Sequence, residues 1–360
     1  MKVVLAGGGS AGHVSPLLAL ADWLVAEDPS TRVTALGTAD GIESRLVPLR
    51  GYELRPIPKV PLPRRPSLAV ARLPGELTRA IRAASAVIAD VQADVVVGFG
   101  GYVSAPAYLA ARRRRVPIVV HEQNSRPGFA NRLGARLTPW VAATFPDTPL
   151  RHAVRTGLPL RPEISGLDRE AVRGSARAAF GLDADRTTLL IFGGSLGAQR
   201  LNDVVPEIRD DLAAIGVQVL HICGTGKSFD VDRAPGGPAY VVTEYVDRME
   251  LAYAAADLVL GRAGANTVSE ITALGLPCVF VPLPIGNGEQ RLNAAPVVAA
   301  GGGLVIDDAE FDADRARSEL LPLLSDPQRL VQMGKVAAEF GRLDAAELLA
   351  AMVRQAVAAR

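Results

Sequence analysis

The sequence predicts an α/β protein built from two doubly wound domains, and three observations support this fold class. Short β-branched runs alternate with alanine-rich helical stretches along all 360 residues. The apolar runs are continuous, as in parallel strands that helices cover on both faces. A glycine-rich turn follows an apolar run near the N-terminus and again near the middle, which indicates that the same kind of unit is built twice.

The expected strands fall into two sets that a proline-rich segment separates. The first set is 2–6, 32–36, 94–98, 116–120 and 140–144, and the second is 187–192, 217–222, 257–260, 277–281 and 302–306. The segment 157–162 lies between the sets and is the expected domain boundary. We therefore expect domains at 1–160 and 161–342, with an alanine-rich helix at about 343–360 that packs back on the first domain.

Composition limits the classes of protein that this chain can belong to. Its length suits two domains of ordinary size, and a net charge of +1 does not indicate a nucleic-acid partner. Cys223 and Cys278 cannot form a disulfide framework, which indicates a reducing cytosol. No apolar run approaches the roughly 18 residues that a membrane span needs. We expect a cytosolic protein that can still touch a membrane surface.

The first glycine turn reads Gly-Gly-Gly-Ser-Ala-Gly-His over residues 7–13. Glycine permits close backbone approach, and the N–H groups of the following helix can bind an anion. The letters also fit the dinucleotide pattern Gly-x-Gly-x-x-Gly, so a nicotinamide-dependent oxidoreductase is an alternative, although Asp40 lies late for its acidic residue. His13 begins the helix and is a candidate base, because a helix N-terminus disfavours imidazolium. Local hydrogen bonding alone is the other interpretation of His13.

Two further segments of the first half follow expected strands. Gly98–Ser104 is another glycine-rich turn, and His121–Asn124 is a run of polar residues. Both fall at the carboxyl ends of strands, where open α/β sheets bind their ligands. Because polar side chains are costly to bury unpaired, the second segment predicts either a ligand site or a structural hydrogen-bond network.

The second half repeats the pattern with different side chains. Its glycine turn is Gly193–Gly197, and a loop at Gly261–Gly264 leads into a second helix. Backbone N–H groups at 265–267 can take a diphosphate, and Glu270 can accept hydrogen bonds from a ribose diol. The alternative for Glu270 is a carboxylate that complements the helix dipole. The polar groups of 288–294 suit the hydroxyls of a sugar.

No metal and no cofactor are expected. The chain lacks a Cys/His spacing typical of metal sites. Asp-x-Asp pairs occur at 183/185, 230/232 and 312/314, but in polar or turn-like contexts and not at the end of a strand.

A basic segment stands out in the first half. Between Arg55 and Arg82 the basic residues are Arg55, Lys59, Arg64, Arg65, Arg72, Arg79 and Arg82. Leu73, Leu77 and Ile81 recur at helical spacing, and Pro74 suits a first helical turn. A basic amphipathic helix can lie on an anionic membrane, and a solvated helix packed on the sheet is the alternative.

Taken in order, these motifs resemble the MurG family, the N-acetylglucosaminyltransferases of peptidoglycan synthesis. The resemblance covers nearly the whole chain and is carried by Gly7–His13, Gly98–Ser104, His121–Asn124, Gly193–Ala198, Thr267–Glu270 and Gln290 with Asn293 and Ala294. It implies a GT-B fold, in which two Rossmann-like domains face a cleft. It also implies transfer of N-acetylglucosamine, with inversion and without a metal, from UDP-N-acetylglucosamine to the muramoyl 4-hydroxyl of undecaprenyl-diphosphate-linked muramoyl-pentapeptide (lipid I), giving lipid II.

The resemblance also implies the site residues. The donor side comprises Ser10, Ala11, Gly12, Asn124, Arg161, Ser195, Val246, Ala265, Asn266, Thr267, Glu270, Glu289 and Gln290. Glu270 would hold the ribose, and the backbone near Val246 would read the uracil. The acceptor diphosphate would lie against Gly8, Gly9, Gly100, Gly101 and Tyr102, with His13 as the catalytic base.

The resemblance further implies membrane contact through the first domain, at segment 59–82, and a peripheral place on the cytoplasmic face of the cell membrane. Two departures from the family pattern matter: the hinge reads Gly157-Leu158-Pro159 where Gly-Asn-Pro is usual, and Glu289 replaces a glutamine or histidine. The alternatives are a GT-B enzyme with another acceptor, a UDP-N-acetylglucosamine epimerase, and a non-catalytic nucleotide-binding protein at the membrane.

Overall fold

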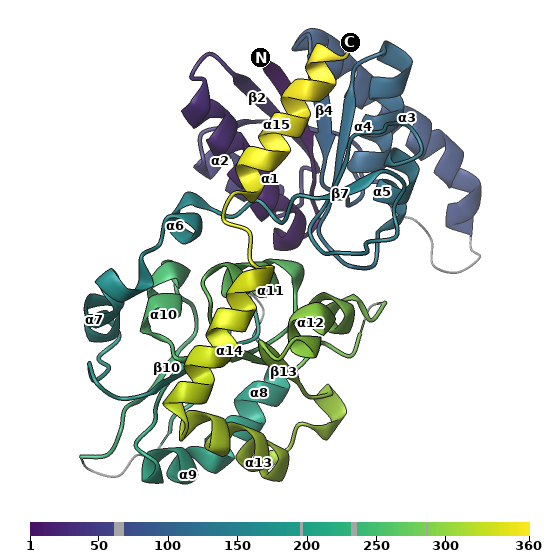
Figure 1. The fold of residues 1–360 in the computed structure, drawn as a ribbon. Coiled ribbons are helices and arrows are strands. Elements are labelled where there is room, and N and C mark those ends of the chain that lie inside the picture. The colour runs from purple at the N-terminus through teal and green to yellow at the C-terminus, as the bar shows by residue number, and fades with distance from the viewer. Residues whose placement is uncertain (61–67, 195–196, 232–235, 286) are drawn as a thin grey trace. The chain divides into compact units, whose positions relative to one another are not determined.

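The chain forms two compact units, each built around one parallel sheet (Figure 1). The computed structural model describes residues 1–360 except 61–67, 195–196, 232–235 and 286, together with the side chains of 68–72. The N-terminal unit consists of Met1–Arg161 and Leu343–Arg360, and the C-terminal unit consists of Pro162–Arg342. The chain therefore passes from one unit to the other twice.

The N-terminal sheet has seven strands in the order β3-β2-β1-β4-β5-β6-β7. These are β1 (Lys2–Ala6), β2 (Arg32–Gly37), β3 (Glu53–Pro56), β4 (Val95–Gly98), β5 (Ile118–Glu122), β6 (Val141–Ala143) and β7 (Ala153–Arg155). All neighbours are parallel, and Val4 lies opposite Thr34 on β2 and Val96 on β4. The strand order reverses between β1 and β4, which is where a doubly wound sheet binds its ligand.

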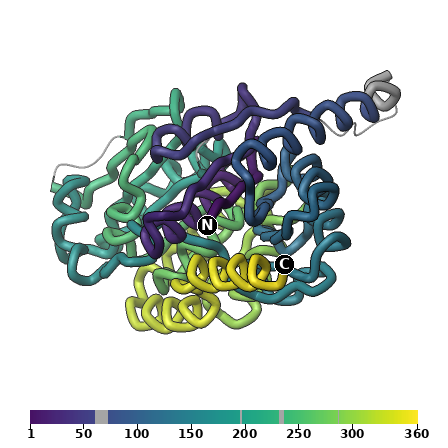
Figure 2. The backbone as a smooth tube through the Cα atoms, turned by 90° about the horizontal axis from the view of Figure 1, so that it is seen from above, coloured from purple at the N-terminus to yellow at the C-terminus, as the bar shows by residue number. Residues whose placement is uncertain are grey.

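Helices cover both faces of this sheet. They are α1 (Ala11–Glu27), α2 (Glu43–Leu49), α3 (Leu68–Asp90), α4 (Ser104–Arg114), α5 (Phe129–Gly134) and α15 (Ala345–Ala358). Because side chains alternate along a strand, Val3 and Leu5 pack with α1 and α15 on one face. Val4 packs with α3 and α4 on the other. α15 returns from the end of the chain to contact α1, β4 and β5 (Figures 1 and 2).

The C-terminal sheet has six parallel strands in the order β10-β9-β8-β11-β12-β13. These are β8 (Thr188–Phe192), β9 (Gln218–Ile222), β10 (Tyr240–Thr243), β11 (Leu258–Gly261), β12 (Cys278–Phe280) and β13 (Gly303–Val305). Here the order reverses between β8 and β11, so the two units share one topology.

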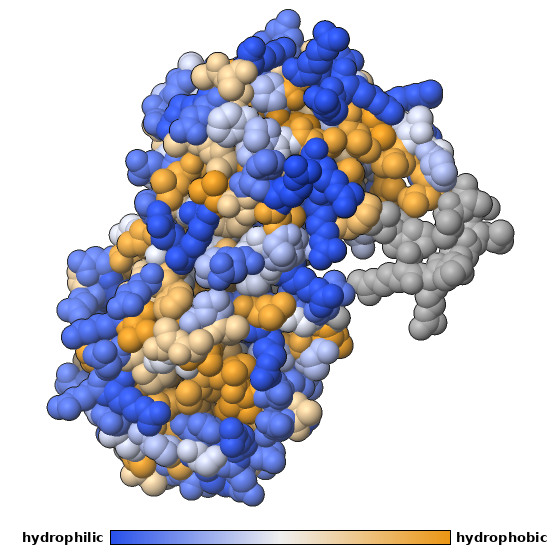
Figure 3. Space-filling view, turned by 45° about the vertical axis from the view of Figure 1, so that its right-hand side comes forward, coloured by the Kyte–Doolittle hydropathy of each residue, from blue (hydrophilic) through white to orange (hydrophobic). Residues whose placement is uncertain are grey.

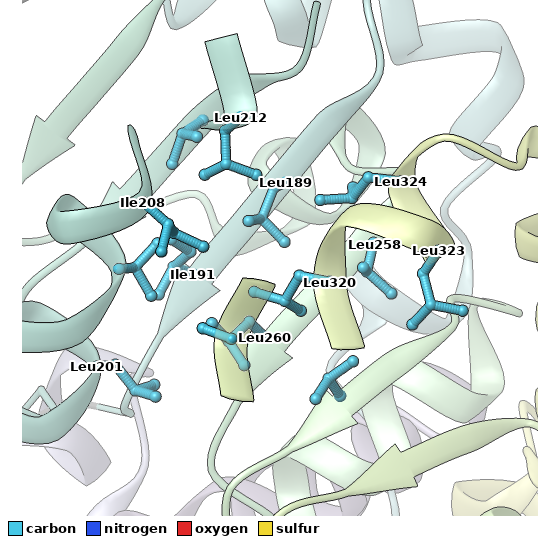
Figure 4. Close-up of a cluster of buried hydrophobic side chains, with 14 of the residues drawn as sticks. Leu189, Ile191, Leu201, Ile208, Leu212, Leu258, Leu260, Leu320, Leu323 and Leu324 are labelled. Atoms are coloured by element: carbon cyan, nitrogen blue, oxygen red, sulfur yellow. The ribbon is translucent and has the colours of Figure 1, made fainter. Parts of the chain in front are cut away.

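The helices of this unit again lie on both faces of the sheet. They are α6 (Pro162–Ser165), α7 (Arg169–Ala179), α8 (Gln199–Val204), η1 (Val205–Ile208), α9 (Arg209–Ala214), α10 (Met249–Ala255), α11 (Ala265–Ala273), α12 (Glu289–Ala299), η2 (Asp308–Glu310), α13 (Ala313–Leu324) and α14 (Pro327–Phe340). One core lies where Leu189 and Leu260 of the sheet meet Leu201, Leu212 and Leu320 of the helices (Figure 4).

The fold predicted from the sequence is confirmed in class and in most elements. Each expected strand is present to within about two residues, but β3, β7 and β10 were not predicted. All three lie at edges of the sheets. The placement of Pro74 in a first helical turn is wrong, because α3 begins at Leu68 and Pro74 lies inside it.

The C-terminal unit contains a buried ion pair that should be important for stability. Asp257 contacts Arg173 and Arg177, accepts the Thr188 N–H at 2.8 Å, and lies 2.7 Å from Nη2 of Arg177. The Arg177 side chain is 3% exposed and that of Asp257 is 17% exposed. Removing one partner of a buried pair leaves an uncompensated charge, whereas an exposed pair contributes little.

We therefore expect Asp257→Ala to lower the free energy of unfolding of this unit by about 3–5 kcal/mol. The matched control is Glu319→Ala, which removes an i,i+4 pair with Arg315 on the surface of α13 and should cost at most about 1 kcal/mol. Urea denaturation measures both variants. Equal losses would contradict this account of the pair.

Candidate active site

The two predicted glycine turns of the N-terminal unit lie against each other. The first follows β1 and the second follows β4, which are neighbours in the sheet. A Cβ atom on Gly101 would lie 2.4 Å from the carbonyl oxygen of Gly8, so no larger residue fits between the turns. Gly100 and Gly101 also have φ of +87° and +77°, a conformation that favours glycine. The predicted residues on both turns are therefore brought together.

His13 lies in the first turn of α1, beside both glycine turns. Its Nδ1 is 2.8 Å from Oγ of Ser10, and a Cβ atom on Gly100 would lie 3.2 Å from its Nε2. Burial lowers the pKa of the His13 imidazole below 6.5, although the Glu43 carboxylate and the Gly8 backbone act in the opposite direction. The ring is therefore neutral near pH 7 and can accept a proton.

The acidic residue that faces the first glycine turn is Glu43, and the sequence did not identify it. Glu43 is 1% exposed at the start of α2, and its Oε2 accepts the N–H of Gly9 at 3.0 Å. Asp40, which was considered for an acidic dinucleotide-binding residue, is 74% exposed at its side chain and lies 4.0 Å from Lys59. The N–H of Gly9, predicted for the acceptor diphosphate, is thus engaged within the protein.

Tyr102 is the exposed side chain of the predicted acceptor set. The residue is 42% exposed, and its ring lies beside Gly9, where a Cβ atom would be 3.7 Å from Cδ2 of the ring. The ammonium of Lys59 lies 5.6 Å from the ring centroid. The ring therefore has a cation beside it next to the glycine turns, and the positive charge of that ammonium suits an anionic ligand.

Most of the polar run His121–Asn124 forms a structural hydrogen-bond network, and its last residue, Asn124, is partly exposed. His121, Glu122 and Gln123 are buried. Burial lowers the pKa of His121 to about 4, so its neutral ring donates from Nε2 to the Gly157 carbonyl at 2.9 Å. Glu122 accepts the N–H of Asn124 at 3.0 Å. Asn124, predicted for the donor sugar, is the first partly exposed residue of the run.

Asn131 joins this network to the sheet, and the sequence did not indicate it. Its Nδ2 donates to Oε2 of Glu122 at 2.9 Å, and its Oδ1 accepts the Tyr108 hydroxyl at 2.8 Å. Burial raises the pKa of the Glu122 carboxyl above its usual value, against the hydrogen bonds that it accepts. The network fixes the loop that carries Asn124.

In the C-terminal unit the glycine turn after β8 is shaped by close backbone contacts. A Cβ atom on Gly197 would lie 2.1 Å from the carbonyl oxygen of Cys223, and Gly197 has φ of +68°. That same carbonyl accepts Nδ2 of Asn202 at 2.9 Å. Asn202 in turn lies 3.0 Å from His221, whose pKa burial lowers to about 3. Ser195, predicted for the nucleotide, lies outside the described residues.

The predicted diphosphate and ribose residues lie on the first turns of α11. Ala265, Asn266 and Thr267 form its N-terminal turn after the cap Gly264, and Oδ1 of Asn266 is buried without a hydrogen-bond partner. Oε2 of Glu270 accepts the hydroxyl of Tyr253 at 2.7 Å. Tyr253 is 1% exposed on α10, and nothing in the sequence pattern indicated that it positions Glu270.

The predicted sugar residues begin α12. Oε1 of Gln290 accepts the N–H groups of Ala263 at 3.1 Å and Leu283 at 2.9 Å, which orients the side chain at the end of the sheet. Oε2 of Glu289 accepts the N–H of Asn287 at 2.8 Å. Both side chains are partly exposed.

The remaining predicted donor residues are spread over three places. Ala11 and Gly12 begin α1, Arg161 is the last residue before the C-terminal unit, and Val246 lies in the loop before α10.

Among the described residues, no group of three or more His, Cys, Asp or Glu is arranged to hold a metal ion. In the same described part of the chain, no helix has the length and apolar character to cross a bilayer.

Comparison with known proteins assigns both units. Residues 3–142 match the glycosyltransferase family 28 N-terminal domain, and residues 188–349 match the glycosyltransferase family 28 C-terminal domain. The chain is 56% identical to a protein of Streptomyces avermitilis, over 100% of this chain and 99% of that one. It is also 56% identical to a protein of Thermobifida fusca, over 97% and 93%. Both relatives are named UDP-N-acetylglucosamine–N-acetylmuramyl-(pentapeptide) pyrophosphoryl-undecaprenol N-acetylglucosamine transferase.

Solved structures agree with this assignment. The crystal structure of Acinetobacter baumannii MurG superposes with a TM-score of 0.80 at 28% identity, covering 98% of this chain and 99% of that one. A UDP-GlcNAc 2-epimerase from Neisseria meningitidis has a TM-score of 0.68 at 15% identity over 99% and 100%, which shows a shared fold alone. The chain belongs to the MurG family of N-acetylglucosaminyltransferases, within glycosyltransferase family 28.

Proposed function

We propose that this chain transfers N-acetylglucosamine from UDP-N-acetylglucosamine to the muramoyl 4-hydroxyl of lipid I and so makes lipid II. The names of its full-length relatives describe this transfer. The observation of the structure that best supports it is the Ser10–His13 pair, a neutral imidazole beside two glycine turns. An imidazole in that state suits removal of a proton from an attacking hydroxyl.

The donor lies on the C-terminal unit in this proposal. The N-terminal turn of α11 offers its N–H groups to the diphosphate, and the buried, unpartnered Oδ1 of Asn266 is a polar atom that a ligand can satisfy. Glu270, oriented by the Tyr253 hydroxyl, accepts from the ribose diol. Glu289 and Gln290 face the sugar, while Val246 lies near the uracil. Ser195, Arg161 and Asn124 complete the donor set.

The chemical step is a single inverting displacement. The acceptor oxygen forms a bond to the anomeric carbon while the bond from that carbon to the diphosphate oxygen breaks, and UDP leaves. His13 takes the hydroxyl proton, and the Gly8 backbone and the Glu43 charge favour the imidazolium that results. Helix and loop N–H groups stabilise the negative charge that develops on the leaving UDP.

The acceptor lies on the N-terminal unit. Its diphosphate is placed at the glycine turns, against Gly8, Gly9, Gly100, Gly101 and Tyr102. The Tyr102 ring and the Lys59 ammonium support this placement, because both stand exposed beside the turns. Ser10, the N-cap of α1, and Ala11 and Gly12, its first residues, belong to the proposed donor set.

The alternatives are weaker on specific observations. An oxidoreductase needs an acidic residue that binds the cofactor ribose. Asp40 instead lies exposed beside Lys59, and the Glu43 carboxylate already accepts the N–H of Gly9. An epimerase shares the fold, but it needs no acceptor. Dependence of UDP release on the acceptor separates these enzymes.

We also propose that the N-terminal unit contacts an anionic membrane surface, on the cytoplasmic face. Arg79 and Arg82 of α3 and the cluster 112–115 at the end of α4 are exposed, and α3 packs against α4. Figure 3 shows hydrophobic side chains gathered on the face of this unit that carries α3 to α5. Of the other basic residues in the segment, Arg64 and Arg65 and the side chain of Arg72 lie outside the described part.

Replacing the proposed base should remove most of the activity without affecting donor binding. We expect His13→Ala to lower kcat by about 10²–10⁴-fold, while UDP-N-acetylglucosamine binds as before. His152→Asn is the matched control, because His152 is exposed with φ of +61° and asparagine tolerates that conformation. Near-normal turnover of His13→Ala would remove His13 from this role.

The pH profile gives a second readout of the same prediction. Burial lowers the His13 pKa below 6.5, so the base stays neutral and active below that pH. The acid limb of kcat/KM, which reports groups of the free enzyme, should therefore lie below pH 6.5 and should disappear in His13→Ala. A limb that persists unchanged in the variant belongs to another group.

Removing the charge of Glu270 should weaken donor binding alone. Hydrogen bonds to a carboxylate contribute about 1.5–3 kcal/mol, so Glu270→Gln should raise KM for UDP-N-acetylglucosamine about ten- to hundredfold. The KM for a lipid I analogue should not change. In the variant, UDP and 2′-deoxy-UDP should inhibit alike. Glu339→Gln, at an exposed position of α14, is the control, and a preserved preference for UDP in Glu270→Gln would contradict the ribose contact.

The membrane contact is tested by charge reversal. Arg79→Glu with Arg82→Glu should lower binding to vesicles of phosphatidylglycerol and phosphatidylcholine by at least about tenfold at low salt, since each basic residue contributes about 1 kcal/mol. The control is Arg200→Glu with Arg329→Glu, exposed arginines of the C-terminal unit. Equal binding by the two double variants would reject a membrane face on α3.

A further inference from the structure

The glycines around the first turn enclose a buried carboxylate. A Cβ atom on Gly8 would lie 2.4 Å from Oε1 of Glu43, and one on Gly41 would lie 2.3 Å from the same atom. A Cβ atom on Gly37 would lie 2.4 Å from Cγ of Glu43. None of these glycines has the positive φ that would by itself favour glycine. Glycine stands at these positions because the Glu43 side chain fills the space that a side chain would need.

The Glu43 carboxylate is held by donors from two loops. Oε2 accepts the N–H of Gly9 at 3.0 Å, and Oε1 accepts the N–H of Thr38 at 2.8 Å and its hydroxyl at 2.9 Å. Burial opposes ionisation of Glu43, but these hydrogen bonds outweigh it and keep the pKa of the carboxyl below its usual value. The group is therefore a buried negative charge at the base of the glycine turn.

This charge accepts a backbone N–H of the kind that a glycine turn can offer to a phosphate. Such turns bind phosphate through backbone N–H groups, but here the N–H of Gly9 already bonds to Glu43. A second anion at the same turn would lie beside a buried carboxylate, which like-charge repulsion disfavours. The N–H of Gly9 thus has its hydrogen-bond partner without a ligand.

The same turn leads directly to the proposed base. Gly9 is followed by Ser10, the N-cap residue of α1, and Oγ of Ser10 lies 2.8 Å from Nδ1 of His13. The conformation of Gly9 therefore sets the position of the serine that orients the imidazole. Glu43 fixes that conformation through its bond to the Gly9 N–H.

We propose that Glu43 is a positioning residue, a built-in anion that holds the first glycine turn in the form that aligns Ser10 with His13. It also excludes the acceptor diphosphate from Gly8 and Gly9, so that the diphosphate lies against the second turn, at Gly100, Gly101 and Tyr102. The inference therefore withdraws Gly8 and Gly9 from the five acceptor residues of the proposed function and keeps the other three, and it rests on the assignment of His13 as the base.

The test uses Glu43→Gln in the full-length chain, with UDP-N-acetylglucosamine and a short-chain lipid I analogue. Glutamine has about the size of glutamate, but an NH₂ group replaces one of the two carboxylate oxygens. That NH₂ group would then face the N–H donor of Gly9 or Thr38 and could not accept its hydrogen bond. We expect kcat to fall about ten- to hundredfold, with KM for either substrate changed by less than about twofold. Glu347→Gln, exposed on α15 of the same unit, should match the wild type, and unchanged UDP affinity and thermal midpoint show that the variant is folded.

A double-mutant cycle separates positioning from general damage. Because Glu43 acts through His13, adding Glu43→Gln to His13→Ala should lower the residual rate by less than about twofold. Multiplicative losses would overturn the inference, as would an unchanged kcat in Glu43→Gln. A KM for the lipid I analogue that rises tenfold at constant kcat would also overturn it, because the turn would then bind the acceptor.

A readout that needs no substrate keeps the inference distinct from the proposed function. In ¹⁵N NMR of the histidine rings, Glu43→Gln should shift the His13 resonances and leave those of exposed His152 in place. An unmoved His13 signal overturns the inference whatever the enzyme assays give. Absence of acceptor-dependent transfer in the wild type, together with a shifted His13 signal, contradicts the proposed function alone.

Discussion

The site-bearing edges of both sheets depend on backbone segments that pack closer than any side chain would allow. Gly101 lies against the carbonyl of Gly8, and Gly197 lies against the carbonyl of Cys223. The turn after β1 thereby contacts the turn after the neighbouring strand β4. In the C-terminal unit the turn after β8 contacts the segment after the neighbouring strand β9. Parallel strands bring these turns to one edge, and glycine lets them approach there. The helices that begin at this edge then carry the polar groups of the site.

Buried polar groups hold this edge in place in both units. Glu43 secures the first glycine turn, and Glu122 with Asn131 secures the loop of Asn124. In the C-terminal unit Tyr253 orients Glu270, and backbone N–H groups orient Gln290. Each of these side chains forms hydrogen bonds with neighbouring protein groups, and these bonds hold a residue of the proposed site in place. Such fully bonded networks are rigid, which suits a site that must place two substrates.

The sequence predicted what periodicity and glycine turns can encode, and it missed what depends on contacts between distant segments. Central strands appear as continuous apolar runs, whereas the edge strands β3 and β7 are short and partly exposed, so Glu53–Pro56 and Ala153–Arg155 give no such run. The pairing of His13 with Ser10 is local in sequence and could be anticipated. Glu43 and Tyr253 lie 34 and 17 residues from the groups that they bind, and only the fold brings these pairs together. Asp40, the acidic residue considered for the dinucleotide pattern although it lies late in that spacing, faces solvent beside Lys59.

The central claim is that a donor sugar held by the C-terminal unit reacts with an acceptor held by the N-terminal unit. The most direct measurement is UDP release from UDP-N-acetylglucosamine, with and without a short-chain lipid I analogue, together with mass analysis of the product. This account predicts release only when the acceptor is present, and one added N-acetylglucosamine on the analogue. Release of UDP without the acceptor, or donor binding with no disaccharide product, would contradict it.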